Sequence, residues 1–310
     1  MASTPIRNHF AIPAATPLRN VMPVRHDRAY GLTGAIELAI ELLMPVHVGT
    51  GTYGLGADGL TRQAMNDPTG LVVPGTSIKG ACRQVHEVLT SSGSPFERDE
   101  QLDFVRDHRN RIDRSVPPLP LSTTAAVFGT LGYAGRVSFD DARTRKDGTP
   151  GIERLSVAYP PPSEQVLRKH QPHLLGRRFY GRLPEGVEHK REVPVVTIPT
   201  TAELETVLRF RNLDEAELGG VLRSLGLGLP GKDRGFTPRL GGGKFDDFGL
   251  VRFRPLRYRL REGLRARELS WHDDAATAAF IARCLLAFHP STEGNQGLEV
   301  LLEKLGEVGS

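Results

Sequence analysis

Two short glycine-bearing stretches carry the residue types that bind phosphate groups. "PGTSIKG", residues 74–80, follows an apolar strand and opens a helix, so that free backbone amides, the positive end of the helix dipole and Lys79 meet at one point. "RLGGGKF", residues 239–245, offers three glycines that let backbone lie against an anion, with Lys244 beside them. Each stretch taken alone also fits a purely structural turn. Ser77 precedes Lys79 without a glycine run, which departs from the P-loop pattern and disfavours NTPase chemistry.

The segment after the second glycine stretch strengthens the phosphate interpretation. It is a predicted strand in which arginines alternate with apolar residues, so that one face is basic and the other apolar. The arginines are Arg252, Arg254, Arg257, Arg259 and Arg261. Such a surface is typical of proteins that track a nucleic-acid backbone. A solvated edge strand, which often carries charge to resist pairing, remains the structural alternative.

A third pattern combines aromatic rings with cations. Phe179 and Tyr180 stand between Arg177, Arg178 and Arg182, an arrangement suited to base stacking beside phosphate contacts. The same residues would serve equally well to anchor a surface loop. We expect them in a projecting insertion over residues 143–200, because that span is dense in Pro, Gly and charge.

The elements that must position these residues follow from local patterns. A buried strand is predicted within residues 33–48, and the glycine run at 49–59 predicts irregular structure. Thr76 or Ser77 is expected to cap the helix that follows. Asp214 and Glu217 form a capping box that predicts a helix ending at Gly226, after a strand that ends at Phe210. A further helix is predicted over residues 273–289, followed by a short amphipathic segment near 297–305.

Composition bounds the class of protein. The 310 residues, with 39% apolar and 25% charged content and a net charge of +4, can bury a substantial core. We predict a Pro- and Arg-rich extended arm over residues 1–32, docked or untethered, and a single domain over 33–310. Cys82 and Cys284 lie far apart, and the sequence holds neither a membrane span nor a signal segment, which indicates a cytoplasmic protein. His170 and His173 lack a third ligand nearby, which disfavours a metal site there.

Taken together, these motifs resemble the RAMP superfamily of CRISPR-associated proteins. "HVGTG" followed by an Asp-bearing loop and "VVPGTSIKGACR" look like the family's first strand, glycine loop and helix start. "VFGTLGYAGRVSFDDA" is similar to a second family segment, and "RLGGGKFDDFG" to its glycine-rich loop near the C-terminus. The resemblance covers residues 33–255 and keeps the family's order of motifs.

The resemblance implies an α+β fold with a ferredoxin-like, RNA-recognition-type core, a protruding thumb hairpin and loop insertions. It implies guide RNA and single-stranded target RNA as ligands, and other effector subunits and copies of the same chain as partners. The expected RNA-binding residues are Gly75, Thr76, Ser77, Lys79, Arg83, Phe179, Tyr180, Gly241, Gly242, Gly243, Lys244, Arg252 and Arg254.

The resemblance further implies a role for an aspartate after the first strand. In backbone subunits of type III complexes such an aspartate supports target-RNA cleavage, and Asp58 occupies the matching place, with Asp67 as the second choice. Its carboxylate would hold Mg²⁺ or another divalent cation, or act as a base. The sequence departs from the family after Asp58, where Gly59 to Arg62 replace an apolar pair and a basic residue. A terminal subunit that does not cut and a soluble enzyme with a phosphate ligand remain the alternatives.

Overall fold

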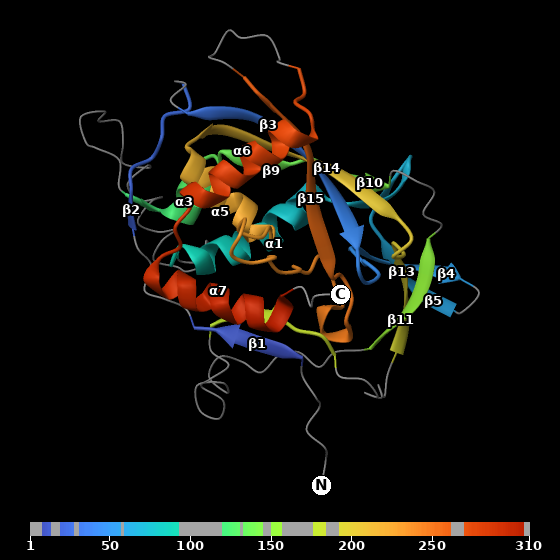
Figure 1. The fold of residues 1–310 in the computed structure, drawn as a ribbon. Helices are drawn as coiled ribbons and strands as arrows, with labels where there is room; N and C mark the ends of the chain where they lie inside the picture. The colour runs from blue at the N-terminus through green and yellow to red at the C-terminus, as the bar shows by residue number, and fades with distance from the viewer. Residues whose placement is uncertain are drawn as a thin grey trace, which may run out of the picture.

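The computed structural model describes residues 8–13, 19–27, 31–56, 59–92, 120–130, 133–144, 150–156, 176–183, 192–261 and 270–306. In these residues the chain forms a central antiparallel sheet backed by helices, with smaller sheets at its margins (Figure 1). The strands are β1 His9–Ile12, β2 Arg19–Val21, β3 Leu32–Leu42, β4 Gly49–Gly56, β5 Gly59–Ala64, β6 Asn66–Asp67, β7 Gly70–Val73, β8 Leu121–Ser122, β9 Val137–Phe139, β10 Ala142–Thr144, β11 Gly151–Ser156, β12 Arg177–Tyr180, β13 Glu192–Thr197, β14 Glu203–Leu213 and β15 Val251–Leu260. The helices are α1 Gly75–Leu89, α3 Thr123–Phe128, α5 Glu215–Ser224, the 3-10 turn η2 Lys244–Asp246, α6 Asp274–Ala287 and α7 Thr292–Leu305.

The central sheet has the ferredoxin-like topology. Four strand units follow one another in the chain: β3 is the first, β9 and β10 together are the second, β14 is the third and β15 is the fourth. Helix α1 precedes the second unit, and α5 precedes the fourth. In the sheet they lie in the order β15-β3-β14-β10, so the first strand lies between the fourth and the third. This β-α-β-β-α-β arrangement confirms the predicted α+β fold with a ferredoxin-like core.

The core lies between this sheet and its helices. Because side chains alternate along a strand, Ile36, Leu38 and Ile40 of β3 point to one face and are fully buried. They share one apolar cluster with residues of α1, α5 and α6. Glu37 and Glu41 point to the opposite face. The sheet therefore has one apolar face covered by helices and one polar face.

Helix boundaries confirm most of the predicted caps. Asp214 and Glu217 form the capping box of α5, and Gly226 follows that helix with a φ of 88°. The predicted cap of α1 is wrong, because the helix begins at Gly75 and its N-cap residue is Pro74, so neither Thr76 nor Ser77 caps it. The last helix, α7, begins five residues before the predicted segment, where Ser291 caps it.

The predicted arm is docked on the domain where it is described. Strand β1 pairs with β12, and β2 pairs with β8. Ile12 of β1 is buried in a second apolar cluster with residues of α1 and α7, including Val85 and Leu301. These contacts favour the docked alternative for the arm.

In the glycine run at residues 49–59, the described residues 49–56 and 59 lie in strands, so the prediction of irregular structure is wrong for them. Strands β4 and β5 pair as a hairpin in a sheet with the order β11-β13-β5-β4. Strands β11 and β13 come from the predicted insertion and join this sheet through a parallel pairing of β13 with β5. The hairpin exposes Leu55 and Leu60, which pair across its strands.

Candidate nucleic-acid interface

The two glycine-bearing turns lie at the same end of the central sheet. Strand β10 pairs with β7 on one side and with the first residues of β14 on the other. These residues of β14 pair in turn with the last residues of β3. At that end the Gly242 amide donates to the His47 carbonyl over 2.8 Å. The next residue, Val48, accepts from Met65, whose own carbonyl accepts from Val72, close to the start of α1. The hairpin base therefore links the two turns through successive backbone hydrogen bonds.

The first turn of α1 is built tightly against the sheet. The Gly75 amide donates to Oδ1 of Asp141 over 2.8 Å, so a carboxylate of this chain already accepts the hydrogen bond of the first helix amide. A Cβ at Gly75 would lie 1.9 Å from the Phe139 carbonyl oxygen, which explains the glycine by packing. Thr76 is exposed and Ser77 half-buried at the helix start. No local sequence pattern indicates this contact, because Asp141 lies 66 residues from Gly75 in the chain.

Lys79 is a partly desolvated cation on the first turn of α1. Burial, with a smaller contribution from the Arg83 charge, lowers the pKa of its ammonium below the ordinary value. A Cβ at Gly135 would lie 3.0 Å from Nζ of Lys79, so glycine leaves room for the ammonium. Among the residues that the structure describes, no carboxylate is paired with it. Its position therefore makes Lys79 available to an external anion.

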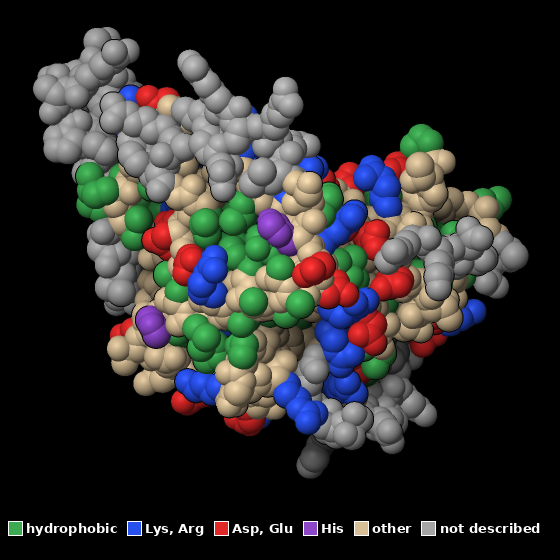
Figure 2. Space-filling view, turned by 45° about the horizontal axis from the view of Figure 1, so that its top comes forward, with side chains coloured by type: hydrophobic (Ala, Val, Ile, Leu, Met, Phe, Trp, Pro, Cys, Tyr) green, Lys and Arg blue, Asp and Glu red, His purple; other side chains and the backbone are tan. Residues whose placement is uncertain are grey.

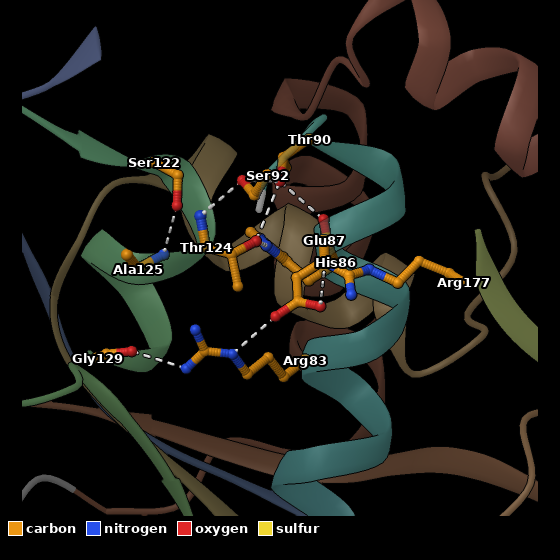
Figure 3. A network of polar contacts seen from close by, with 10 residues as sticks. All are labelled: Arg83, His86, Glu87, Thr90, Ser92, Ser122, Thr124, Ala125, Gly129 and Arg177. Atoms are coloured by element: carbon orange, nitrogen blue, oxygen red, sulfur yellow. Dashed lines mark hydrogen bonds and ion pairs between the residues drawn. The ribbon is translucent and has the colours of Figure 1, made fainter. Parts of the chain in front are cut away.

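Arg83 lies one turn further along α1 and is engaged inside the protein (Figure 3). Its guanidinium donates to Glu87 over 2.9 Å and to the Gly129 carbonyl over 2.7 Å. Glu87 is buried and also pairs with Arg177 of β12 at 3.3 Å. In the same network His86, with no exposed surface, shares a 2.7 Å hydrogen bond with Thr124. These contacts give Arg83 a role in joining α1 to α3 and β12.

The second glycine turn is also shaped by close backbone approach. Gly241 and Gly243 have φ values of 76° and 70°, in the left-handed region that favours glycine. A Cβ at Gly241 would lie 2.3 Å from the His47 carbonyl oxygen. Lys244 follows the turn, and burial together with Arg239 lowers the pKa of its ammonium. Within the described part of the chain, the Lys244 ammonium has no acidic partner.

The arginines of β15 lie on the polar sheet face, where cross-strand acids neutralise them. Arg252 pairs with Glu41 at 2.8 Å, Arg254 with Glu203 at 3.4 Å, and Arg257 with Glu37. Figure 2 shows this mixture in its right half, where Lys and Arg side chains alternate with Asp and Glu. The strand itself has the predicted basic and apolar faces, but β3 and β14 contribute acids opposite its arginines, so the surface they share is mixed in charge.

The aromatic pair on β12 divides between core and surface. Phe179 is buried in the second apolar cluster and stacks on Phe10 with 5.8 Å between ring centroids. It is therefore a core residue, and the expectation that it offers an exposed face to a base is corrected. Tyr180 is half-buried, and its ring tilts against His9 at 6.3 Å.

The structure describes one of the two candidate catalytic acids, Asp67. Asp58 lies outside the described residues. Asp67 accepts hydrogen bonds from the Thr69 amide and hydroxyl and pairs with Arg143 at 2.8 Å. The Thr69 bonds, followed by those from Arg143, lower the pKa of Asp67 to about 2. These contacts give Asp67 a role in building a turn. No cluster of three or more potential metal ligands occurs among the described residues.

The fold and the two glycine turns define the class first: an α+β protein with a ferredoxin-like sheet and two glycine turns linked at one end of it. The family model of the RAMP superfamily matches residues 39–260. The chain therefore belongs to the RAMP superfamily. A search of curated proteins found no match. None of the described helices combines the length and the apolar character that a membrane span requires.

Proposed function

We propose that this chain binds a single-stranded guide RNA as a backbone subunit of a CRISPR effector complex. The observation that carries the proposal is the pair Lys79 and Lys244, two partly buried cations that each follow one of the two linked glycine turns in the chain. In the described part of the chain neither ammonium is matched by a carboxylate, whereas the β15 arginines are ion-paired. Membership of the RAMP superfamily supports an RNA ligand and a CRISPR complex.

The balance of charges favours the lysines over the sheet arginines as phosphate contacts. A phosphate that binds Lys79 or Lys244 adds an interaction without breaking one, and partial burial strengthens the attraction. A phosphate that binds Arg252 or Arg254 must compete with Glu41 or Glu203. We therefore expect the strand to pass over the end of the sheet that holds the two turns, with Thr76, Ser77 and Tyr180 nearby as further contacts.

The test is the salt dependence of RNA binding. For single strands the logarithm of the binding constant falls with the logarithm of salt concentration by about 0.7 per phosphate contact. Lys79→Met and Lys244→Met should each reduce that slope by about 0.7, measured by filter binding of an oligoribonucleotide. Arg254→Gln, which removes an ion-paired cation of the same sheet, is the matched control and should change the slope less. Unchanged slopes in both lysine variants would refute the proposal.

Target cleavage is a finer part of the proposal. We infer that Asp58, between β4 and β5, supports Mg²⁺-dependent cleavage of a target strand paired with the guide. The assembled complex with Asp58→Ala should lose cuts at regular spacing and keep its RNA, while Asp67→Asn should keep both. Retained RNA and no cuts in the wild-type complex would instead indicate a terminal subunit that does not cut.

The remaining alternative is a soluble enzyme with a phosphate ligand. It predicts that RNA-free protein binds a discrete nucleotide and that no RNA of one length accompanies the purified chain. Sequencing the nucleic acid retained on the protein therefore separates this alternative from the RNA-binding proposals.

A further inference from the structure

A small cavity has Lys244, the residue that follows the second glycine turn, in its lining. It has a volume of about 40 Å³ and lies between α1, β12 and the segment that leads into η2. Its polar lining consists of Gln84, Arg178, Tyr180, Arg239 and Lys244. Phe236 and Leu305 form part of its apolar wall. Three of the described lining side chains are therefore cations, and no Asp or Glu is among the described residues of the lining.

The three cations differ in how far the protein satisfies them. Arg239 is fully engaged, because it donates to the carbonyls of Tyr180, Gly181 and Phe248 and pairs with Asp247 at 2.5 Å. Its positive charge, together with burial, lowers the pKa of Lys244. The Lys244 ammonium has no carboxylate beside it in the described residues.

Arg178 adds an unsatisfied donor. Its Nε is buried and has no hydrogen-bond partner among the described residues. The backbone at this position is fixed, since Gln84 donates to the Arg178 carbonyl over 2.6 Å and Ala11 of β1 pairs with Arg178. Leaving a buried charged donor without a partner is costly, and native proteins satisfy such groups with protein, water or ligand.

The size of the cavity limits its occupant. One water needs about 10–15 Å³ of such space, so a cavity of about 40 Å³ has room for roughly three waters or one small ion. A base or a nucleoside would not fit. An oxyanion supplies several acceptor oxygens and a negative charge, which match a lysine ammonium and a guanidinium donor.

We propose that this cavity is a binding site for a phosphate-class oxyanion, held by Lys244 and Arg178 beside the fixed charge of Arg239. The site is distinct from the path of the guide along the two glycine turns, although Lys244 serves both. The source of the group is either free phosphate or the terminal phosphate of an oligonucleotide.

The experiment measures binding of inorganic phosphate to the RNA-free chain by calorimetry, and by the shift in melting temperature against chloride at equal ionic strength. We expect saturable binding and a rise in melting temperature with phosphate alone. Lys244→Met and Arg178→Gln should each weaken binding by at least about tenfold, the loss of one charge-assisted hydrogen bond. Arg182→Gln is the matched control, because Arg182 acts electrostatically on Arg239 but does not line the cavity.

The outcomes separate this proposal from guide binding. Lys79→Met should weaken RNA binding and leave phosphate binding unchanged. Arg178→Gln should weaken phosphate binding more than it weakens RNA binding. An equal response to chloride, or wild-type phosphate affinity in both cavity variants, would overturn the proposal. Oligoribonucleotides with a 5′-phosphate and with a 5′-hydroxyl identify the source. Displacement of phosphate by the first alone assigns the site to an RNA end, and displacement by neither assigns it to the free anion.

Discussion

Acidification should destabilise this protein through one buried histidine. His86 has no exposed surface, and burial, with a smaller effect of Arg83, lowers its pKa from 6.5 to about 3. Its Nδ1 shares a 2.7 Å hydrogen bond with the Thr124 hydroxyl, and its buried Nε2 has no hydrogen-bond partner in the part of the chain that the structure describes. A second proton on this ring would therefore create a buried N–H group whose hydrogen bond neither water nor a described protein acceptor can accept.

The sign and size of the effect follow from the two pKa values. Between about pH 6.5 and about pH 3 the unfolded state binds the proton and the folded state does not. The free energy of unfolding therefore decreases as the pH is lowered through this range. The contribution of His86 is complete above its unfolded pKa of about 6.5. The loss amounts to about 2 kcal/mol between about pH 8 and about pH 5.

Urea denaturation at several pH values measures this loss. His86→Asn can retain a hydrogen bond to Thr124 and removes the titrating group, so its free energy of unfolding should fall by about 2 kcal/mol less than that of the wild type over the same range. Arg254→Gln, which leaves His86 in place, should keep the wild-type pH dependence. If His86→Asn keeps the wild-type slope, the neutral buried histidine is not its cause and the reasoning fails.

Three further predictions concern stability. Arg136→Met should lower the free energy of unfolding by about 3–5 kcal/mol, because it leaves Glu217 without its partner, and adding Glu217→Gln should restore part of the loss in urea titrations. Gly219→Ala should cost about 1–3 kcal/mol, since its Cβ would lie 2.0 Å from a carbonyl of α6, whereas Gly80→Ala on open α1 surface should stabilise by about 0.5–1 kcal/mol. Phe179→Ala should lower the melting temperature of RNA-free protein with a loss of about 3–5 kcal/mol, and a wild-type melting temperature would contradict its core role.

Local patterns predicted the elements whose ends are fixed by neighbouring residues. The capping box at Asp214 and Glu217 specifies a helix start within four residues, and Gly226 supplies its end. The alternation of Arg252 and Arg254 with apolar residues likewise identified β15. These features depend on interactions close in sequence, and the structure confirms them.

The character of the sheet face depends on contacts distant in sequence. Glu37 and Glu41 of β3 are the cross-strand partners of Arg257 and Arg252, more than 200 residues away in the chain. The sequence alone does not state which strands become neighbours, so a strand that is basic by itself was predicted to form a basic surface. Phe179 is a similar case, because its burial depends on residues of α1, α7 and β1.

The second apolar cluster also bears on how the protein is made. It brings Ile12 of β1 together with Leu301 and Leu305 of α7, so this part of the interior closes only when both segments have left the ribosome. Until then the cluster's inner face on α1, with Val85 and Leu89, remains open to solvent or to a chaperone. The ferredoxin-like sheet can form earlier in synthesis, and closure of the second cluster is expected as a late step of maturation.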